Sequence, residues 1–208
     1  VFLSADLGSG GKGGTLRLWN LVKGKSQFKT RLPGAADVVA FAPGAAPETY
    51  ALLCGDSLTV RSLAASAPAD GEDDAPAASA GIVASFGGAG SGVGRQQAAC
   101  WLDANVLVSG GDDGALHLWD ARTKGAKSAC RVARAHGARV KGVASMASGC
   151  GGGEESQRIA SCATDGTVRL WDLRAALSSP CSSSSAAGEE KLSTPLASAE
   201  ASGARLTC

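Results

Sequence analysis

A serine, a histidine and an aspartate, the residue types of a hydrolase catalytic triad, occur close together in the second half of the chain. His136 is followed by Ser161 and Asp165, and all three precede Trp171. In a triad the histidine accepts the proton of the serine hydroxyl, while the aspartate orients the imidazole. These residues therefore raise the question of nucleophilic catalysis.

The spacing of this set is repeated along the chain. The serine and the aspartate lie ten and six residues before Trp171, and the same spacing recurs in Ser109, Asp113 and Trp119. Repetition favours a structural unit, in which carboxylate, imidazole, hydroxyl and indole N–H groups satisfy one another in a core where unpaired polar groups are costly. We therefore predict a structural network without catalytic residues, and a protein that is not an enzyme. Its members are His136, Ser161, Asp165, Trp171, Ser109, Asp113 and Trp119.

The glycine-rich stretch GSGGKGGTLRLWN, residues 8–20, has the composition of a phosphate-binding loop but not its pattern. A Walker loop places Ser or Thr directly after its lysine and a helix after the loop. Here Lys12 is followed by Gly13, and Thr15 to Trp19 alternate in polarity as a half-buried strand does. The stretch predicts a lengthened hairpin turn and no nucleotide cofactor.

No set of residues has the spacing of a metal site. Cys130 with His136, and Cys150 with Cys162, match no tetrahedral zinc pattern, and His117 lies between two leucines as a solvated or edge histidine would. We therefore predict no metal and no cofactor. The seven cysteines include no C-x-x-C pair, which favours reduced thiols in a cytosolic or nuclear protein.

Charge and hydropathy exclude two broad classes. The formal net charge is +1 with 19% charged residues, so no global field steers the chain to nucleic acid or to an anionic membrane. The longest uncharged run, residues 75–94, is mostly Ala, Gly and Ser, and it is too weakly apolar to span a bilayer. We expect no membrane association, and any contact with RNA would be local.

Four short alternating segments reveal an internal repeat. Their equivalent positions are separated by 42, 58 and 52 residues, close to the roughly 40 to 45 residues of a WD40 repeat once insertions are removed. The segments are TLRLWNL at 15–21, SLTVRSL at 57–63, ALHLWDA at 115–121 and TVRLWDL at 167–173. The second has Arg61 in place of tryptophan, and the middle repeat lacks the histidine, so we expect both blades to be less rigid.

The elements that position these residues are predicted to be strands only. Short strands at this spacing, joined by Gly and Asp turns, indicate an all-β WD40 β-propeller. We predict a partial ring of about three full blades with flanking half-blades, a fragment of a seven-bladed propeller. The units are a blade end at 1–22, blades at 23–63, 81–122 and 123–174, a low-complexity insertion at 64–80, a linker at 176–190 and the start of a further blade at 191–208.

Three segments are more particular than the generic repeat: residues 16–44, residues 134–143 and the terminal ARLTC at 204–208. Their order and spacing resemble the p21-activated protein kinase-interacting protein 1-like family. The resemblance implies a nuclear, nucleolar scaffold in ribosome biogenesis, acting in large-subunit assembly and pre-rRNA processing, and a second role as a negative regulator that binds p21-activated kinase.

The implied partners are pre-ribosomal large-subunit proteins and pre-rRNA, met by a monomeric propeller within a larger complex. Basic side chains offer contacts to RNA phosphates, although a solvated outer strand explains them equally well. They are Lys23, Lys25, Lys29 and Arg31.

An alternative function is suggested by WDAR at 119–122 and WDLR at 171–174. These resemble the motif through which substrate receptors of cullin-4 ubiquitin ligases grip their adaptor. The residues of that alternative adaptor surface are Asp120, Arg122, Asp172 and Arg174. A generic WD40 protein-interaction scaffold is the remaining alternative.

Overall fold

A computed structural model describes residues 2–5, 14–32, 34–44, 49–63, 81–88, 93–123, 130–132, 134–146, 157–174 and 195–200. Several sequence features lie outside these residues: the glycine-rich loop at 8–13, the insertions at 64–80 and 149–156, the linker at 176–190, Cys150 and the terminal ARLTC segment.

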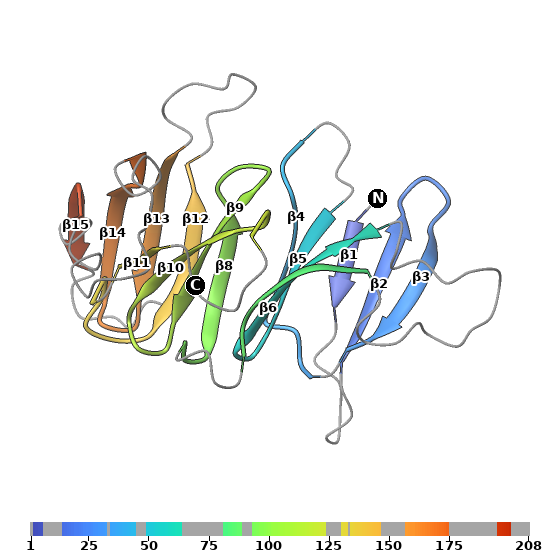
Figure 1. Cartoon of the computed structure of the whole chain (residues 1–208), viewed down its shortest axis with the longest axis horizontal. Helices are drawn as coiled ribbons and strands as arrows, with labels where there is room; N and C mark the ends of the chain where they lie inside the picture. The colour runs from blue at the N-terminus through green and yellow to red at the C-terminus, as the bar shows by residue number, and fades with distance from the viewer. Residues whose placement is uncertain are drawn as a thin grey trace.

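The described residues form four antiparallel sheets, which Figure 1 shows side by side in chain order. The first sheet has three strands, β1 (Phe2–Ala5), β2 (Thr15–Asn20) and β3 (Lys25–Arg31). The second has β4 (Val38–Phe41), β5 (Thr49–Cys54), β6 (Ser57–Ser62) and β7 (Ile82–Gly87). The third has β8 (Gln96–Trp101), β9 (Val106–Gly111), β10 (Leu116–Asp120) and β11 (Cys130–Val132), and the fourth has β12 (Val140–Ser145), β13 (Arg158–Ala163), β14 (Thr167–Asp172) and β15 (Ala197–Glu200).

Within each sheet every strand pairs with its neighbour in sequence, so each sheet is an antiparallel meander. The sheets are therefore offset by one strand from the repeat boundaries expected above. The strand that opens a sequence repeat, such as β7 or β11, hydrogen-bonds to the end of the preceding repeat. β15 likewise completes the fourth sheet by pairing with β14.

The predicted all-β partial propeller is confirmed: the four sheets form an open arc. Three apolar clusters fill the spaces between successive sheets, one around Leu16 and Leu52, one around Phe86 and Trp119, and one around Val108 and Trp171. Sheets that are covered by a neighbour on each side remove both faces from water, which is how stacked repeats build a continuous core.

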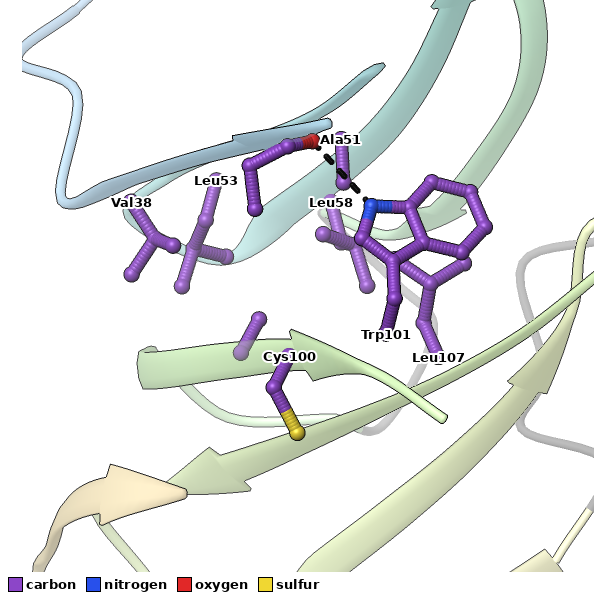
Figure 2. A pocket seen from close by; sticks show the side chains of 9 residues that line it. Val38, Ala51, Leu53, Leu58, Cys100, Trp101 and Leu107 are labelled. Atoms are coloured by element: carbon purple, nitrogen blue, oxygen red, sulfur yellow. Dashed lines mark hydrogen bonds between the residues drawn. The ribbon is translucent and has the colours of Figure 1, made fainter. Parts of the chain in front are cut away.

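Figure 2 shows the contact between the second and third sheets. Val38, Leu53 and Leu58 face Trp101 and Leu107 so closely that no room remains for even a water molecule. The indole Nε1 of Trp101 also donates a hydrogen bond of 3.1 Å to the backbone oxygen of Ala40. This hollow is a packed interface and not a ligand pocket.

Between the third and fourth sheets the backbones approach closely at Gly110. A Cβ atom there would lie 2.4 Å from Cγ1 of Val140 on β12. Only glycine lets β9 and β12 meet at this distance.

The strands on either side of the glycine-rich loop pair antiparallel, from Phe2 with Trp19 to Ala5 with Leu16, as the predicted hairpin requires. No described helix is long and apolar enough to cross a membrane. Cys54 and Cys100 are free thiols, but Cys162 is in a disulfide, so the expectation of reduced cysteines is wrong at this position.

Candidate functional site

A continuous chain of hydrogen bonds runs through the fourth sheet. Nε1 of Trp171 donates to Oγ of Ser161 at 2.8 Å, and this hydroxyl lies 2.7 Å from Nε2 of His136. Nδ1 of the same imidazole lies 2.8 Å from Oγ1 of Thr167, which donates to Oδ1 of Asp165 at 2.7 Å. The sequence-predicted His, Ser, Asp and Trp are thus brought together, with Thr167 as a link that the spacing did not reveal.

Two of the groups along this chain constrain the proton positions. The carboxylate of Asp165 can only accept, so Thr167 donates to it and accepts from Nδ1–H of His136. Burial lowers the pKa of His136, which favours the neutral imidazole. With its proton on Nδ1, the neutral ring accepts at Nε2 the proton of Ser161, whose oxygen accepts from the indole N–H.

The arrangement has the residue types of a catalytic triad, but a substrate cannot reach its serine. Ser161 and His136 are each 2% exposed, and a lone pair of the hydroxyl is engaged by the indole. A nucleophile must reach a reacting carbonyl, whereas this serine lies inside a sheet interface. The geometry explains the residues as a polar network that ties the loop before β12 to β13 and β14.

The third sheet builds the same network with glutamine in place of histidine. Nε1 of Trp119 donates to Oγ of Ser109 at 2.7 Å, and this hydroxyl lies 2.7 Å from Oε1 of Gln96. The glutamine Nε2 then donates to the backbone oxygen of Gly94 at 2.8 Å. Asp113 is not part of this chain: it lies in the β9–β10 turn and pairs with Arg131 at 2.9 Å. The blade that lacks the histidine thus has Gln96 as the partner of its serine.

The first sheet carries a shorter version. Nε1 of Trp19 donates to Oγ of Ser4 at 2.8 Å across fifteen residues, five more than the usual ten. The glycine-rich loop accounts for the longer spacing, which hid Ser4 from the pattern. The second sheet has no such chain among its described residues, because Leu52 and Arg61 occupy the serine and tryptophan positions of the register.

His117 is buried and not solvated, so the expectation of an exposed or edge histidine is wrong. It is 1% exposed, and its ring stacks on Trp119 with centroids 5.6 Å apart. Burial lowers its pKa to about 4; nearby Asp113 raises it and Arg131 lowers it further. The alternation correctly placed His117 on the strand face opposite Leu116 and Leu118. That face was expected to be open to solvent, but the second sheet packs against it at Trp119.

The residues of the alternative adaptor surface form two matching pairs. Arg122 Nε donates to Asp120 at 2.9 Å, and Arg174 Nε donates to Asp172 at the same distance. In each pair the arginine backbone N–H also bonds the aspartate. The hydrogen bonds from these arginines lower the pKa of Asp120 and of Asp172. Both guanidinium groups remain largely exposed, at the end of neighbouring sheets.

Basic side chains gather on the outer part of the first sheet. Lys29 on β3 lies directly opposite Arg17 on β2, an arrangement of like charges that destabilises a strand pair. No acidic residue occurs from residue 7 to 36. Exposed cations of this surface are Lys23, Lys25, Lys29 and Arg31. Within the described part of the chain, no three His, Cys, Asp or Glu side chains cluster so as to hold a metal ion.

The repeated sheets and their Trp-linked networks define the class. Residues 90–120 and 128–172 match the family model described as "WD domain, G-beta repeat". These residues therefore carry WD40 repeats, and the fold of the described residues is an open arc of a WD40 β-propeller.

A curated relative adds a particular similarity. The chain is 26% identical over 161 residues to "p21-activated protein kinase-interacting protein 1-like" of Danio rerio, covering 76% of this chain and 36% of that protein. This confirms the resemblance predicted from residues 16–44 and 134–143. The chain spans only about a third of the relative's length.

Two solved structures share the fold. One is the Polycomb Repressive Complex 2 of Chaetomium thermophilum, a humanized mutant bound to the inhibitor GSK126, with a TM-score of 0.55, 19% identity and coverage of 77% of this chain and 33% of that one. The other is Chaetomium thermophilum Sqt1 bound to the N-terminus of the ribosomal protein L10, with a TM-score of 0.56, 19% identity and coverage of 77% and 41%.

Proposed function

We propose that the protein is a non-enzymatic WD40 scaffold of ribosome biogenesis, located in the nucleolus, that contacts large-subunit assembly proteins and pre-rRNA. The observation that carries the RNA contact is the basic outer surface of the first sheet, defined by Lys23, Lys25, Lys29 and Arg31. Four exposed cations without a nearby acidic residue in sequence form an electrostatic footprint for phosphates.

Two further observations support the proposal. The candidate catalytic serine is buried in a network that stabilises a sheet, which leaves the loops and outer strands for partners. The relative in Danio rerio carries the name of the family that the sequence resembles. The similar Sqt1 structure has the N-terminus of a ribosomal protein bound to it.

The test is sedimentation of a nuclear extract from cells in which the protein is tagged at its own locus. We expect it to co-migrate with large-subunit rRNA precursors, and these precursors to accumulate when it is depleted. Lys29→Glu with Arg31→Glu should weaken co-migration, whereas the matched reversal at Arg122 and Arg174 should not. Sedimentation only with free proteins would refute the assembly role.

Kinase binding is a second activity, favoured by the name of the relative. It predicts a complex between the purified protein and the regulatory region of a p21-activated kinase, with reduced kinase activity. Unchanged activity at saturating protein would exclude regulation.

The ubiquitin-ligase alternative is favoured by the two matching Asp–Arg pairs, which present guanidinium groups in the same way on two sheets. Reversal to glutamate at Arg122 and Arg174 should then abolish capture of the cullin-4 adaptor. Both side chains are exposed, so their reversal should leave the fold intact and a loss of capture would not reflect unfolding. Unchanged capture would rule the alternative out.

A further inference from the structure

The second sheet leaves open the space that a polar network fills in the fourth. By register, Leu52 takes the place of Ser161 and Arg61 that of Trp171. The loop before β4 contributes Gly34 and Ala35, whereas the loop before β12 contributes the ring of His136. In the second sheet this leaves a pocket of about 400 Å³, which is bordered by the loop before β4, by β5 and β6, and by the turn between them.

Arg61 forms part of the wall of this pocket and is only 2% exposed. Its Nε donates to Oγ1 of Thr59 at 3.3 Å, but its Nη1 is buried and has no hydrogen-bond partner. Among the described residues, no carboxylate lies within ion-pair distance of its guanidinium. A buried charge without a counterion is costly, so an anion that reaches this guanidinium is favoured.

The rim of the pocket restricts which anion fits. Arg95 pairs with Asp37 at 3.3 Å, and Asp56 also borders the opening. Arg95 offsets the charge of Asp37, so Asp56 leaves the opening with a net negative charge, which repels a doubly charged phosphate or the continuous charge of a nucleic acid more strongly than a single carboxylate. An arginine can bind a carboxylate or a phosphate, so it is the acidic rim that favours the singly charged carboxylate.

We propose that this pocket binds a glutamate or aspartate side chain of a protein partner, with Arg61 as the residue that pairs with its carboxylate. The inference rests on the proposed scaffold function, and it names a partner class for it: a protein with an acidic segment. The pocket volume is at the lower end for ligand sites, which suits one side chain presented by a peptide.

The probe is a fluorescein-labelled peptide that carries one glutamate among glycines and serines, and its binding to the purified protein is followed by fluorescence anisotropy. The same peptide with glutamine or phosphoserine in place of the glutamate, and an RNA oligonucleotide, serve as comparisons. We expect the glutamate peptide to bind, and Arg61→Met to weaken this binding by at least about tenfold. Arg139→Met, which removes an exposed arginine paired with Asp112 on another sheet, is the matched control and should bind as the parent does.

Stability separates binding from a structural role of Arg61. Replacing an unpaired buried charge by an apolar side chain of similar length should leave the unfolding midpoint unchanged or raise it. Binding held by the basic surface of the first sheet would persist in Arg61→Met, so persistence overturns the proposal. Ala35→Leu, which narrows the pocket without touching Arg61, should also weaken binding.

Other results are equally decisive. Tighter binding of the phosphoserine peptide or of RNA in an Arg61-dependent manner overturns the carboxylate assignment, and equal binding of glutamate and glutamine peptides overturns the site. Loss of peptide binding with intact co-sedimentation of rRNA precursors refutes this inference alone. Peptide binding without co-sedimentation refutes the ribosomal function and leaves the pocket standing.

Discussion

Ser161 stabilises the fourth sheet because it satisfies two buried groups at once. Its removal in Ser161→Ala leaves the indole N–H of Trp171 and Nε2 of His136 without partners. We expect the free energy of unfolding to fall by about 1–3 kcal/mol, measured by urea denaturation. Ser85→Ala, at an exposed serine of β7, is the control and should change it by less than about 0.5 kcal/mol. Equal effects of the two substitutions would contradict the network.

His117 should make stability depend on pH. Its folded pKa of about 4 lies below the unfolded value, so the unfolded chain binds the proton more readily as the pH falls below about 6.5. The stabilisation is therefore present above pH 6.5 and is lost towards pH 4. Between pH 7 and pH 5 the loss amounts to about 2 kcal/mol. His117→Gln should lose correspondingly less over this range in paired denaturation curves, and the same loss in both proteins would contradict the assignment.

The chemistry of single residues was only partly predictable. The spacing to Trp171 identified Ser161 and Asp165, because that spacing is set by one hairpin. Gln96 was not predicted, because the repeat pattern expects a histidine and a glutamine amide accepts the bond from Ser109 in its place. The burial of His117 depends on a neighbouring sheet, which strand periodicity does not describe.

The alternation of apolar and polar residues predicted where the strands lie, but it did not predict which strands share a sheet. The pattern located β9, β10 and β14, where apolar residues alternate or run together between turn residues. Which strand closes a sheet depends on hydrogen bonding between successive repeats, so β7 and β11 fall in the sheet before the one that sequence boundaries suggest. The space beside Arg61 was equally invisible, because it arises from residues that are far apart in the sequence and lie on different elements, such as Ala35, Leu52 and Arg95.

The close approach of β9 to β12 predicts coupling between two residues. In Gly110→Ala the new Cβ lies 2.4 Å from Val140 Cγ1, so the sheets must shift, at a cost of about 1–3 kcal/mol. Val140→Ala removes the nearest clashing atom, Cγ1, and leaves Cβ at 2.7 Å, so it relieves part of the clash. We expect a double-mutant cycle in urea to show that Gly110→Ala costs less in the Val140→Ala background, with a coupling of about 0.5–3 kcal/mol. Additive effects would mean that strand propensity, and not contact between the sheets, sets the cost.

At the scale of the whole molecule, charge is unevenly distributed although its sum is near zero. The chain has 20 basic and 19 acidic residues, but six basic residues and one acidic residue lie in the first 36, so the rest of the sequence is net acidic. The overall composition argued against nucleic-acid binding, because the net charge averages over this uneven distribution. A polyanion that meets the first sheet experiences a local field that the net charge of +1 conceals.

This asymmetry makes RNA binding by the protein depend on salt in a residue-specific way. Each phosphate contact to single-stranded RNA contributes about −0.7 to the slope of log binding constant against log salt. Lys29→Gln with Arg31→Gln should therefore make the slope shallower by about 1.4, measured by anisotropy with an RNA oligonucleotide. The pair Arg122→Gln and Arg174→Gln changes the net charge equally and should leave the slope unaltered. If both pairs change the slope alike, attraction is a property of net charge and the basic surface is a solvated outer strand.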